Sequence, residues 1–133
     1  MSHKSKKKLQ AVRAGIVGLE VLPMLKDCIG KKNEYVEMLG VNVKITSQRY
    51  ALFQKSITCV KCGIEGQYFA VENGNIRDTN NYHLNLYALD ADGKEVLMTK
   101  DHILASFRGG KNHSSNYQTM CQPCNHQKGV KDE

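Results

Sequence analysis

Two C-x-x-C pairs are the residues whose types and spacing most clearly indicate chemistry. Cys59 and Cys62 form the first pair, and Cys121 and Cys124 form the second. A C-x-x-C turn delivers two thiolates to one side, and two such turns complete the tetrahedral shell of a structural zinc ion. We therefore predict one zinc ion held by all four cysteines. The alternative is two redox-active or buried cysteine pairs.

The distance between the pairs shows that a folded segment must separate them. Cys62 and Cys121 are 58 residues apart, not counting the cysteines, whereas simple zinc ribbons leave about 15–20 residues between their pairs. The fifth cysteine, Cys28, is interpreted as a small buried apolar residue.

Composition indicates a small basic protein with a polyanionic partner. The chain has 133 residues, 41% of them hydrophobic, and 19 Lys and Arg against 13 Asp and Glu give a formal charge of +6. That length allows one compact domain, or a small domain with an appendage. The positive charge favours nucleic acid first and an acidic membrane second.

The same composition guides our expectation for the cellular compartment. The cysteines are not the dense, even set of a secreted disulfide scaffold, and we recognise no signal peptide or apolar run of roughly 18 residues for a membrane helix. We expect a soluble protein of the cytoplasm that does not bind membranes.

Residues 1–57 are predicted to form a basic and mainly helical region. Val12, Ile16 and Leu19 recur at helical spacing, and Pro23 would end or kink that helix. Residues 34–39 show a second, shorter helical pattern. The region carries no motif that we can connect to chemistry.

The end of this region combines a strand pattern with a capped helix. Residues 41–45 alternate between apolar and polar side chains. Thr46 or Ser47 could cap a helix that runs to Lys55. Tyr50 and Phe53 on that helix are expected in the core rather than as platforms for bases.

Residues 58–133 predict a second unit built mainly of strands. Strand patterns lie at residues 67–71, at 83–89 and from residue 95 into Asp101, with a loop at 73–81 and a hairpin turn at 90–94. A short strand at 117–120 precedes a helix at 122–128. Pro123 suits the first turn of that helix and Gly129 suits its C-terminal cap.

From residue 58 to about residue 130 the chain resembles the HNH endonucleases, a family of zinc-braced ββα-metal nucleases. The resemblance rests on motifs that occur in the family's order and spacing: Asp101-His102-Ile103, Gly109-Gly110, Asn116 to Cys121, Cys124-Asn125 and Lys128-Gly129. The whole chain also looks like the small standalone HNH proteins of bacteriophages. The resemblance implies an α+β fold with a ββα-metal core, here preceded by the mainly helical region.

The resemblance also implies a role for each matching residue. His102 would be the general base that takes a proton from the attacking water, and Asn116 would bond across the loop and fix its ring. Asp101 and Asn125 would hold one divalent cation, Mg²⁺ or Mn²⁺. Histidine side chains titrate near neutral pH, which suits proton removal, and a few oxygen ligands suit Mg²⁺.

Backbone geometry gives one argument for this assignment and one condition. Adjacent helical residues point about 100° apart, so Cys124 can face zinc while Asn125 faces the catalytic cation. Neighbours on a strand point to opposite faces, so Asp101 and His102 reach one site only if the strand ends or distorts there.

The expected partner is DNA, which the family cuts to leave a 5′ phosphate and a 3′ hydroxyl. Residues near the site that could contact phosphates are Arg108, Lys111, Lys128 and His126, with the N-terminal lysines. A homodimer or docking to a larger phage or host complex is also open. His3, His83 and His113 are expected to face solvent.

Two other functions are compatible with parts of this pattern. A zinc-ribbon protein that binds nucleic acid without catalysis needs the cysteines but not Asp101, His102 and Asn125 together. A redox protein could use the C-x-x-C pairs, but the chain lacks the βαβ pattern typical of that class.

Overall fold

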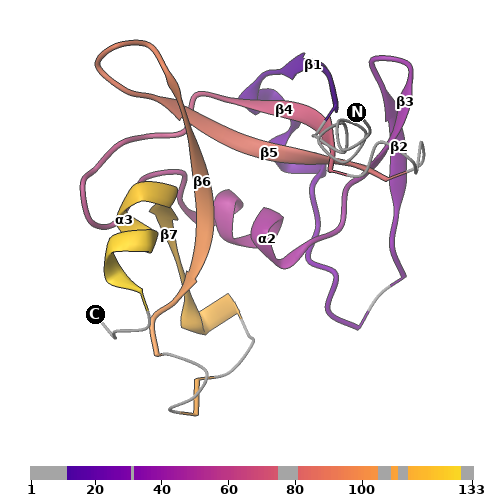
Figure 1. Cartoon of the computed structure of the whole chain (residues 1–133). Coiled ribbons are helices and arrows are strands. Elements are labelled where there is room, and N and C mark those ends of the chain that lie inside the picture. Colours follow the sequence, from indigo (N-terminus) through magenta and orange to yellow (C-terminus); the bar gives the residue numbers. More distant parts are fainter. Residues whose placement is uncertain (1–11, 31, 75–80, 105–108, 111–113, 130–133) are drawn as a thin grey trace, which may run out of the picture.

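The computed structural model describes residues 12–30, 32–74, 81–104, 109–110 and 114–129. These residues form a mixed α+β fold in which strands outnumber helices (Figure 1). The strands are β1 (Val12–Val17), β2 (Tyr35–Met38), β3 (Val41–Lys44), β4 (Tyr68–Asn73), β5 (Tyr82–Leu89), β6 (Glu95–His102) and β7 (Tyr117–Cys121). The helices are α2 (Gln48–Lys55) and α3 (Gln122–Lys128), with 3₁₀ turns η1 (Leu19–Met24) and η3 (Ser114–Asn116).

One sheet joins the strands on both sides of residue 57. Its order is β1-β4-β5-β3-β2, and β6 pairs with the end of β5 before it pairs with β7. In Figure 1, β6 descends from the β5–β6 hairpin toward α3 and β7, away from the other strands. Because β1 and β3 pair with β4 and β5, the boundary between residues 57 and 58 does not separate two sheets. The division into units 1–57 and 58–133 stays a prediction.

The prediction of a mainly helical N-terminal region is wrong. Residues 12–17 form strand β1, which pairs antiparallel with β4, and Pro23 lies inside the 3₁₀ turn that follows. The helical stripe is not buried, since Ile16 is 49% exposed. Gly15 and Gly18 disfavour a helix, whereas β-branched residues such as Val12 and Ile16 favour a strand when a partner strand is present.

The short helix expected at residues 34–39 is also wrong. Residues 35–38 form β2, which is one arm of a hairpin with β3. The two-residue connection, Leu39-Gly40, has positive φ at both positions, 54° and 81°. Tight β-hairpin turns require this conformation, and they usually place Asn or Asp where this chain has a leucine. The alternating pattern that predicted β3 is confirmed.

Helix α2 begins and ends as its sequence predicts. The Ser47 hydroxyl accepts a hydrogen bond from the Arg49 backbone N–H at 3.1 Å, so Ser47 is the N-cap, and the helix ends at Lys55. Tyr50 and Phe53 are fully buried, as expected. Phe53 packs against Phe69 of β4 with ring centroids 6.4 Å apart. Helix α2 therefore packs into the hydrophobic core that the sheet strands share with β7.

Tyr50 also bridges the place where β3 and β5 separate. The two strands share one parallel pair, Val43 with Tyr82. Beyond it, the Tyr50 hydroxyl donates to the Lys44 carbonyl and accepts from the Leu84 N–H, both at 2.9 Å. The two backbone groups are thereby satisfied without a strand ladder.

The strand and helix predictions for the C-terminal part are confirmed. Strands β4, β5, β6 and β7 and helix α3 lie where their patterns indicate. Gly93, with φ of 80°, forms the turn between β5 and β6, and Gly129 follows α3 at φ of 62°. Most of the loop predicted at 73–81 lies outside the described residues, although Asn73 ends β4. The order β6, β7, α3 gives the ββα arrangement that positions the candidate site.

Candidate metal centre and nuclease site

The four paired cysteines converge on one point. Their sulfur atoms all lie within 4.8 Å of one another, and the Cys62 and Cys121 sulfurs are 3.7 Å apart. Zinc–thiolate bonds of about 2.3 Å in a tetrahedron require sulfur–sulfur distances of about 3.8 Å. The cluster therefore fits one zinc ion. It also favours the four-cysteine prediction over two independent cysteine pairs.

Backbone hydrogen bonds shape the first cysteine pair into a tight turn. The Gly63 N–H donates to the Cys59 carbonyl at 3.0 Å, and the Cys59 N–H donates to the Ile64 carbonyl at 2.8 Å. Gly63 has φ of 82°, which favours glycine. The Val60 N–H donates to the Thr119 carbonyl of β7. This bond holds the first cysteine turn against β7, two residues from Cys121, and so brings together two cysteine pairs that are far apart in sequence.

The thiols of the cluster differ in how readily they ionise. Burial opposes ionisation of Cys59, but backbone N–H groups at Cys62, Cys121 and Lys61 outweigh it and lower its pKa to about 6. Burial raises the pKa of Cys124 to about 12, and hydrogen bonding to the other thiols adds to this. Four thiolates repel one another at such distances. A bound cation of high charge is the natural compensation.

On one face of β6, side chains meet helix α3. Thr99 and Asp101 are two residues apart on the strand and so share a face. The Asn125 amide donates to the Thr99 hydroxyl at 2.9 Å. The Lys128 ammonium lies 2.6 Å from Asp101 Oδ2, and Gln118 donates to the same oxygen at 3.1 Å. The structure thus brings Asp101 and Asn125 to one side, where α3 covers the strand.

His102 lies at the end of the same strand but belongs to the other face. The β6–β7 ladder is unbroken through the pairs Asp101–Gln118 and His102–Tyr117. The His102 ring stands edge-on to Tyr117, with centroids 5.0 Å apart and planes at 75°. The strand therefore does not distort between Asp101 and His102. It ends at His102, so the two side chains flank the strand terminus from opposite faces.

Asn116 fastens the chain immediately after His102. Its side-chain oxygen accepts the Leu104 N–H at 2.9 Å, and its side-chain nitrogen donates to the Leu104 carbonyl at 3.0 Å. The Asn116 backbone carbonyl accepts the Ile103 N–H at 2.8 Å. These bonds cross the loop as expected. They act on the backbone next to His102, and any effect on its ring stays a prediction.

Two further residues belong to this site that the sequence interpretation did not assign to it, since Thr99 and Gln118 bond to Asn125 and Asp101. Lys128 was expected near the site as a DNA contact, but it carries the buried ion pair with Asp101. The signals were present in the spacing. Thr99 lies two residues before Asp101 on a strand, and Lys128 lies three residues after Asn125 on a helix.

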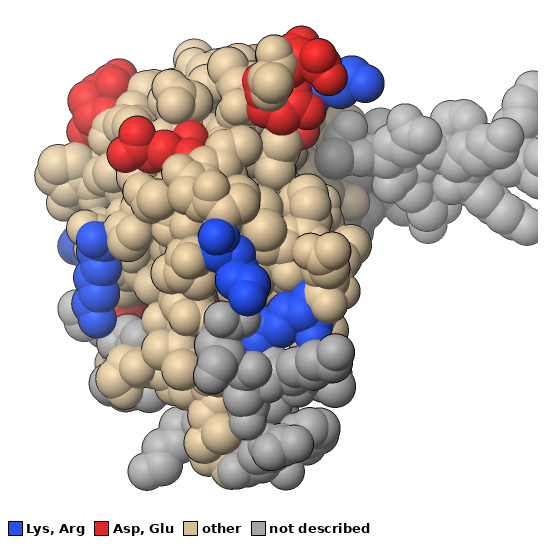
Figure 2. All heavy atoms as spheres, turned by 90° about the vertical axis from the view of Figure 1, so that its left-hand side faces the viewer, with Lys and Arg blue, Asp and Glu red and all other residues tan. Residues whose placement is uncertain are grey.

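The residues predicted to contact DNA have different surroundings. His126 is exposed on α3. Lys128 is buried, and its ammonium also donates to the His102 carbonyl at 2.8 Å. Arg108, Lys111 and the N-terminal lysines lie outside the described residues. Figure 2 shows the face on the left of Figure 1, where Lys and Arg form separate groups below several acidic side chains. Charge alone therefore does not mark a DNA surface on this face.

Three remaining expectations can be compared with the structure. Cys28 is only partly buried rather than a core residue. His83 is partly buried and lines a pocket rather than facing solvent, whereas His3 and His113 lie outside the described residues. None of the helices formed by the described residues is long and apolar enough to cross a membrane.

Comparison with known proteins gives one match. Residues 90–132 match the family model for HNH endonucleases. The match includes Asp101, His102, Asn116, Asn125 and the second cysteine pair, but not Cys59 and Cys62. No curated protein and no solved structure matches the chain significantly. Family and geometry agree on the same segment, which suggests a nuclease, and residues 90–132 are similar to the HNH endonucleases.

Proposed function

We propose that the chain is a metal-dependent endonuclease that hydrolyses phosphodiester bonds in DNA. The proposal is carried by the family match to HNH endonucleases over residues 90–132. It is supported by the contacts that hold α3 against the end of β6 within that segment. DNA is the substrate that the family implies, and the positive charge of the chain agrees with it.

In this proposal His102 is the general base. Its imidazole takes a proton from a water molecule, and the water oxygen forms a bond to phosphorus. The bond from phosphorus to the 3′ oxygen then breaks, which leaves a 3′ hydroxyl and a 5′ phosphate. The edge-on contact with Tyr117 restricts the rotation of the ring, which lowers the entropic cost of positioning the base.

Asp101 and Asn125 would hold a divalent cation, Mg²⁺ or Mn²⁺. Both are oxygen donors of the kind that Mg²⁺ prefers. The Oδ1 atoms of Asp101 and Asn125 accept no hydrogen bond from the described residues, since the bonds of these side chains use Oδ2 of Asp101 and the Asn125 nitrogen. When bound, such a cation polarises the phosphate and stabilises the leaving oxygen.

The remaining parts of the proposal concern the zinc and the surroundings. Zinc at the four cysteines would brace the unit of residues 58–133. Arg108, Lys111 and His126 would contact phosphates, and Asn116 would keep the His102 ring in place. Thiolate ligands need a reducing compartment, which agrees with the cytoplasm. Cutting both DNA strands would need a dimer or two visits by one site.

Plasmid cleavage by the zinc-loaded protein with Mg²⁺ or Mn²⁺ tests the proposal. His102→Ala should lower the rate by about 10²–10⁴-fold, the range typical for a general base. Gln127→Ala removes an exposed side chain of α3 that has no role in the proposal, and as the control it should retain most of the rate. Equal cleavage by wild type and His102→Ala would reject His102 as the base.

A zinc-braced protein that binds nucleic acid without cleaving it is the second candidate. The ion pair of Lys128 with Asp101 favours it, because an ammonium already neutralises the carboxylate that the cation would need. If folded, zinc-loaded wild type binds DNA but cuts no form of plasmid with either cation, this function replaces the first.

A further inference from the structure

A polar pocket lies in the N-terminal half, where β3 and β5 separate and α2 begins. Its volume is about 210 Å³, and its lining side chains include Lys44, Ser47, Arg49 and His83. Binding pockets for larger organic ligands usually measure about 300–1,000 Å³. The pocket is therefore of the size that suits a single small group such as phosphate.

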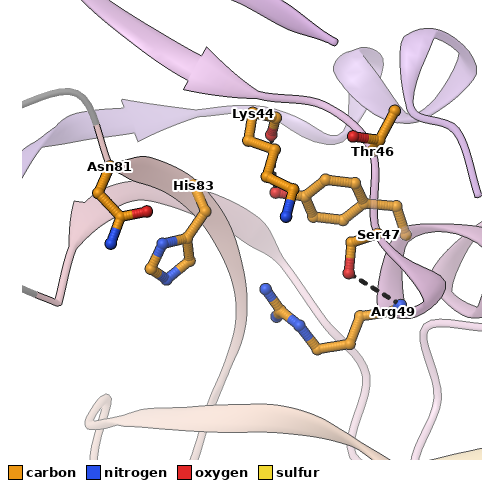
Figure 3. Close-up of a pocket in the computed structure, with 7 residues that line it drawn as sticks. Lys44, Thr46, Ser47, Arg49, Asn81 and His83 are labelled. Atoms are coloured by element: carbon orange, nitrogen blue, oxygen red, sulfur yellow. Dashed lines mark hydrogen bonds between the residues drawn. The ribbon is translucent and has the colours of Figure 1, made fainter. Parts of the chain in front are cut away.

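Three basic side chains face one another across this pocket. Figure 3 shows the Lys44 ammonium, the Arg49 guanidinium and the His83 ring directed toward a common space. They come from three elements, β3, α2 and β5, and all three are partly buried. Burial lowers the pKa of His83, and the positive charges of Arg49 and Lys44 lower it further. The positive charge of the pocket thus comes from Lys44 and Arg49, in a place where water screens it incompletely.

No carboxylate among the described residues forms an ion pair with Lys44 or Arg49. Arg49 donates instead to the Leu84 carbonyl at 3.3 Å and to Asn85 Oδ1 at 3.4 Å, which are long hydrogen bonds. Asn85 in turn donates to Glu72, but Glu72 is already paired with Arg13 at 2.7 Å. Partly buried cations favour an anionic partner, and among the residues that the structure describes no carboxylate supplies one.

The pocket also offers further donors for an anion. It lies at the first turn of α2, where backbone N–H groups and the helix dipole favour negative charge. The Ser47 hydroxyl accepts from the Arg49 N–H, so its own hydrogen remains to be donated. Arginine and lysine with a hydroxyl are a usual donor set for phosphate oxygens.

A line of contacts joins this pocket to His102. The Lys100 ammonium and the Tyr117 hydroxyl both donate to the side-chain oxygen of Gln48, at 3.1 and 2.8 Å. Gln48 precedes Arg49 on α2, and Tyr117 contacts the His102 ring. Lys100 also lies 4.2 Å from the centre of the Tyr117 ring. A series of side-chain contacts therefore links the start of α2, at the pocket, to the proposed base.

We propose that the pocket of Lys44, Arg49 and His83 binds a phosphate of the DNA backbone, away from the phosphate that is cut. The inference deepens the proposed function, on which its choice of DNA rests. The pocket would give the N-terminal half a role in positioning the substrate. Because phosphate contacts carry no sequence information, the contact would add affinity for any duplex.

DNA binding by the zinc-loaded full chain tests the inference. Affinity for a labelled duplex is measured by fluorescence anisotropy over a series of salt concentrations, with Ca²⁺ replacing Mg²⁺ to prevent cleavage. Lys44→Met should weaken binding roughly tenfold, the usual worth of a charged hydrogen bond. It should also reduce the slope of log affinity against log salt by about 0.9, the value for one phosphate contact.

Matched variants separate this contact from general charge and from misfolding. Lys55→Met removes an exposed lysine from the other end of α2 and should leave the slope unchanged. Arg49→Lys keeps the charge but loses the guanidinium fork, and it should weaken binding without unfolding the chain. In wild type, inorganic phosphate should weaken DNA binding more than chloride at equal ionic strength. In Lys44→Met that difference should disappear.

The outcomes distinguish the pocket from the catalytic site. Wild-type affinity and slope in Lys44→Met would overturn the inference, as would a wild type that does not bind DNA. If inorganic phosphate binds the pocket but the affinity for DNA does not depend on Lys44, the pocket is a small-anion site and the inference is wrong. If the wild type does not cleave DNA but Lys44→Met shows the expected change in slope, the pocket inference stands and the nuclease proposal is wrong.

Discussion

The two ends of helix α3 lie at two different kinds of site. At its start, Cys121 and Cys124 join a sulfur cluster that fits a metal ion. At its end, the Lys128 ammonium lies 2.6 Å from the Asp101 carboxylate. Asn125 lies between the two ends and reaches β6 through Thr99. One short helix is therefore held at one end by residues that need a metal and at the other by an ion pair.

This difference teaches how a small site would be rigid before the proposed catalytic cation binds. Clustered thiolates repel one another without a cation, so the first end would depend on the proposed zinc ion. The carboxylate at the second end is neutralised by the chain itself, so that end can stay folded without Mg²⁺. The following predictions test the two ends separately by removing the contacts at each end in turn.

Removing the zinc should have the largest effect. In Cys121→Ser with Cys124→Ser, or after chelation, the C-terminal half should unfold, because apparent zinc binding free energies of about 10–16 kcal/mol exceed most domain stabilities. Hydrogen exchange should show lost protection in β6, β7 and α3. Metal analysis should fall from about one zinc per chain to none.

Cys28→Ser is the matched control for zinc removal, since Cys28 is a partly buried cysteine outside the cluster. It should keep its zinc and its protection. A double serine variant that still binds one zinc and stays protected would show that the cluster is not the brace of this fold.

Local signals explain why the C-terminal part of the fold was predictable. Pro123 and Gly129 bound helix α3, and Gly93 forms the β5–β6 turn. Strand β1 has no such markers. Residues 12–17 become a strand because β4 offers an edge to pair with, and no pattern within those six residues reveals that edge.

The candidate site was predictable in its members but not in their contacts. The order of the motifs identified Asp101, His102 and Asn125 through a resemblance, and the comparison supports the family. Their orientation depends on the β6–β7 register, which pairs His102 with Tyr117 and keeps the strand regular. Lys128 was expected to contact DNA because it flanks the proposed site in the sequence and carries a positive charge. Its burial against Asp101 results from the packing of α3 on β6.

Breaking the ion pair at the other end of α3 should have the next largest effect. Lys128→Met leaves the buried Asp101 carboxylate without its ammonium, which should reduce the free energy of unfolding by about 3–5 kcal/mol. Mg²⁺ should restore much of this loss, because a cation beside Asp101 replaces the missing charge. Thermal unfolding with and without Mg²⁺ measures both effects.

The control for this prediction is Gln127→Met, an exposed neighbour on the same helix. It should show no loss and no added response to Mg²⁺. If Mg²⁺ stabilises wild type and Lys128→Met equally, the cation does not bind next to Asp101. The C-terminal end of α3 would then not lie at a cation site.

The smallest effect on stability is expected between the two ends, at Asn125. Asn125→Ala removes the 2.9 Å hydrogen bond to Thr99 and should lower the free energy of unfolding by about 1 kcal/mol. Thr99→Val removes this bond and also the 2.6 Å bond from the Thr99 hydroxyl to the Met120 carbonyl, so it should lower it by about 2 kcal/mol. Only Asn125→Ala also removes a proposed ligand of the cation. It alone should raise the Mg²⁺ concentration for half-maximal cleavage, by roughly 10–100-fold.

A titration of plasmid cleavage with Mg²⁺ compares these two variants directly. Because Thr99→Val loses at least as much stability as Asn125→Ala, a raised Mg²⁺ requirement in Asn125→Ala alone cannot come from lost stability. Equal Mg²⁺ dependence in both would mean that Asn125 acts by holding α3 to β6, and the ligand role would then pass from Asn125 to another oxygen donor near Asp101.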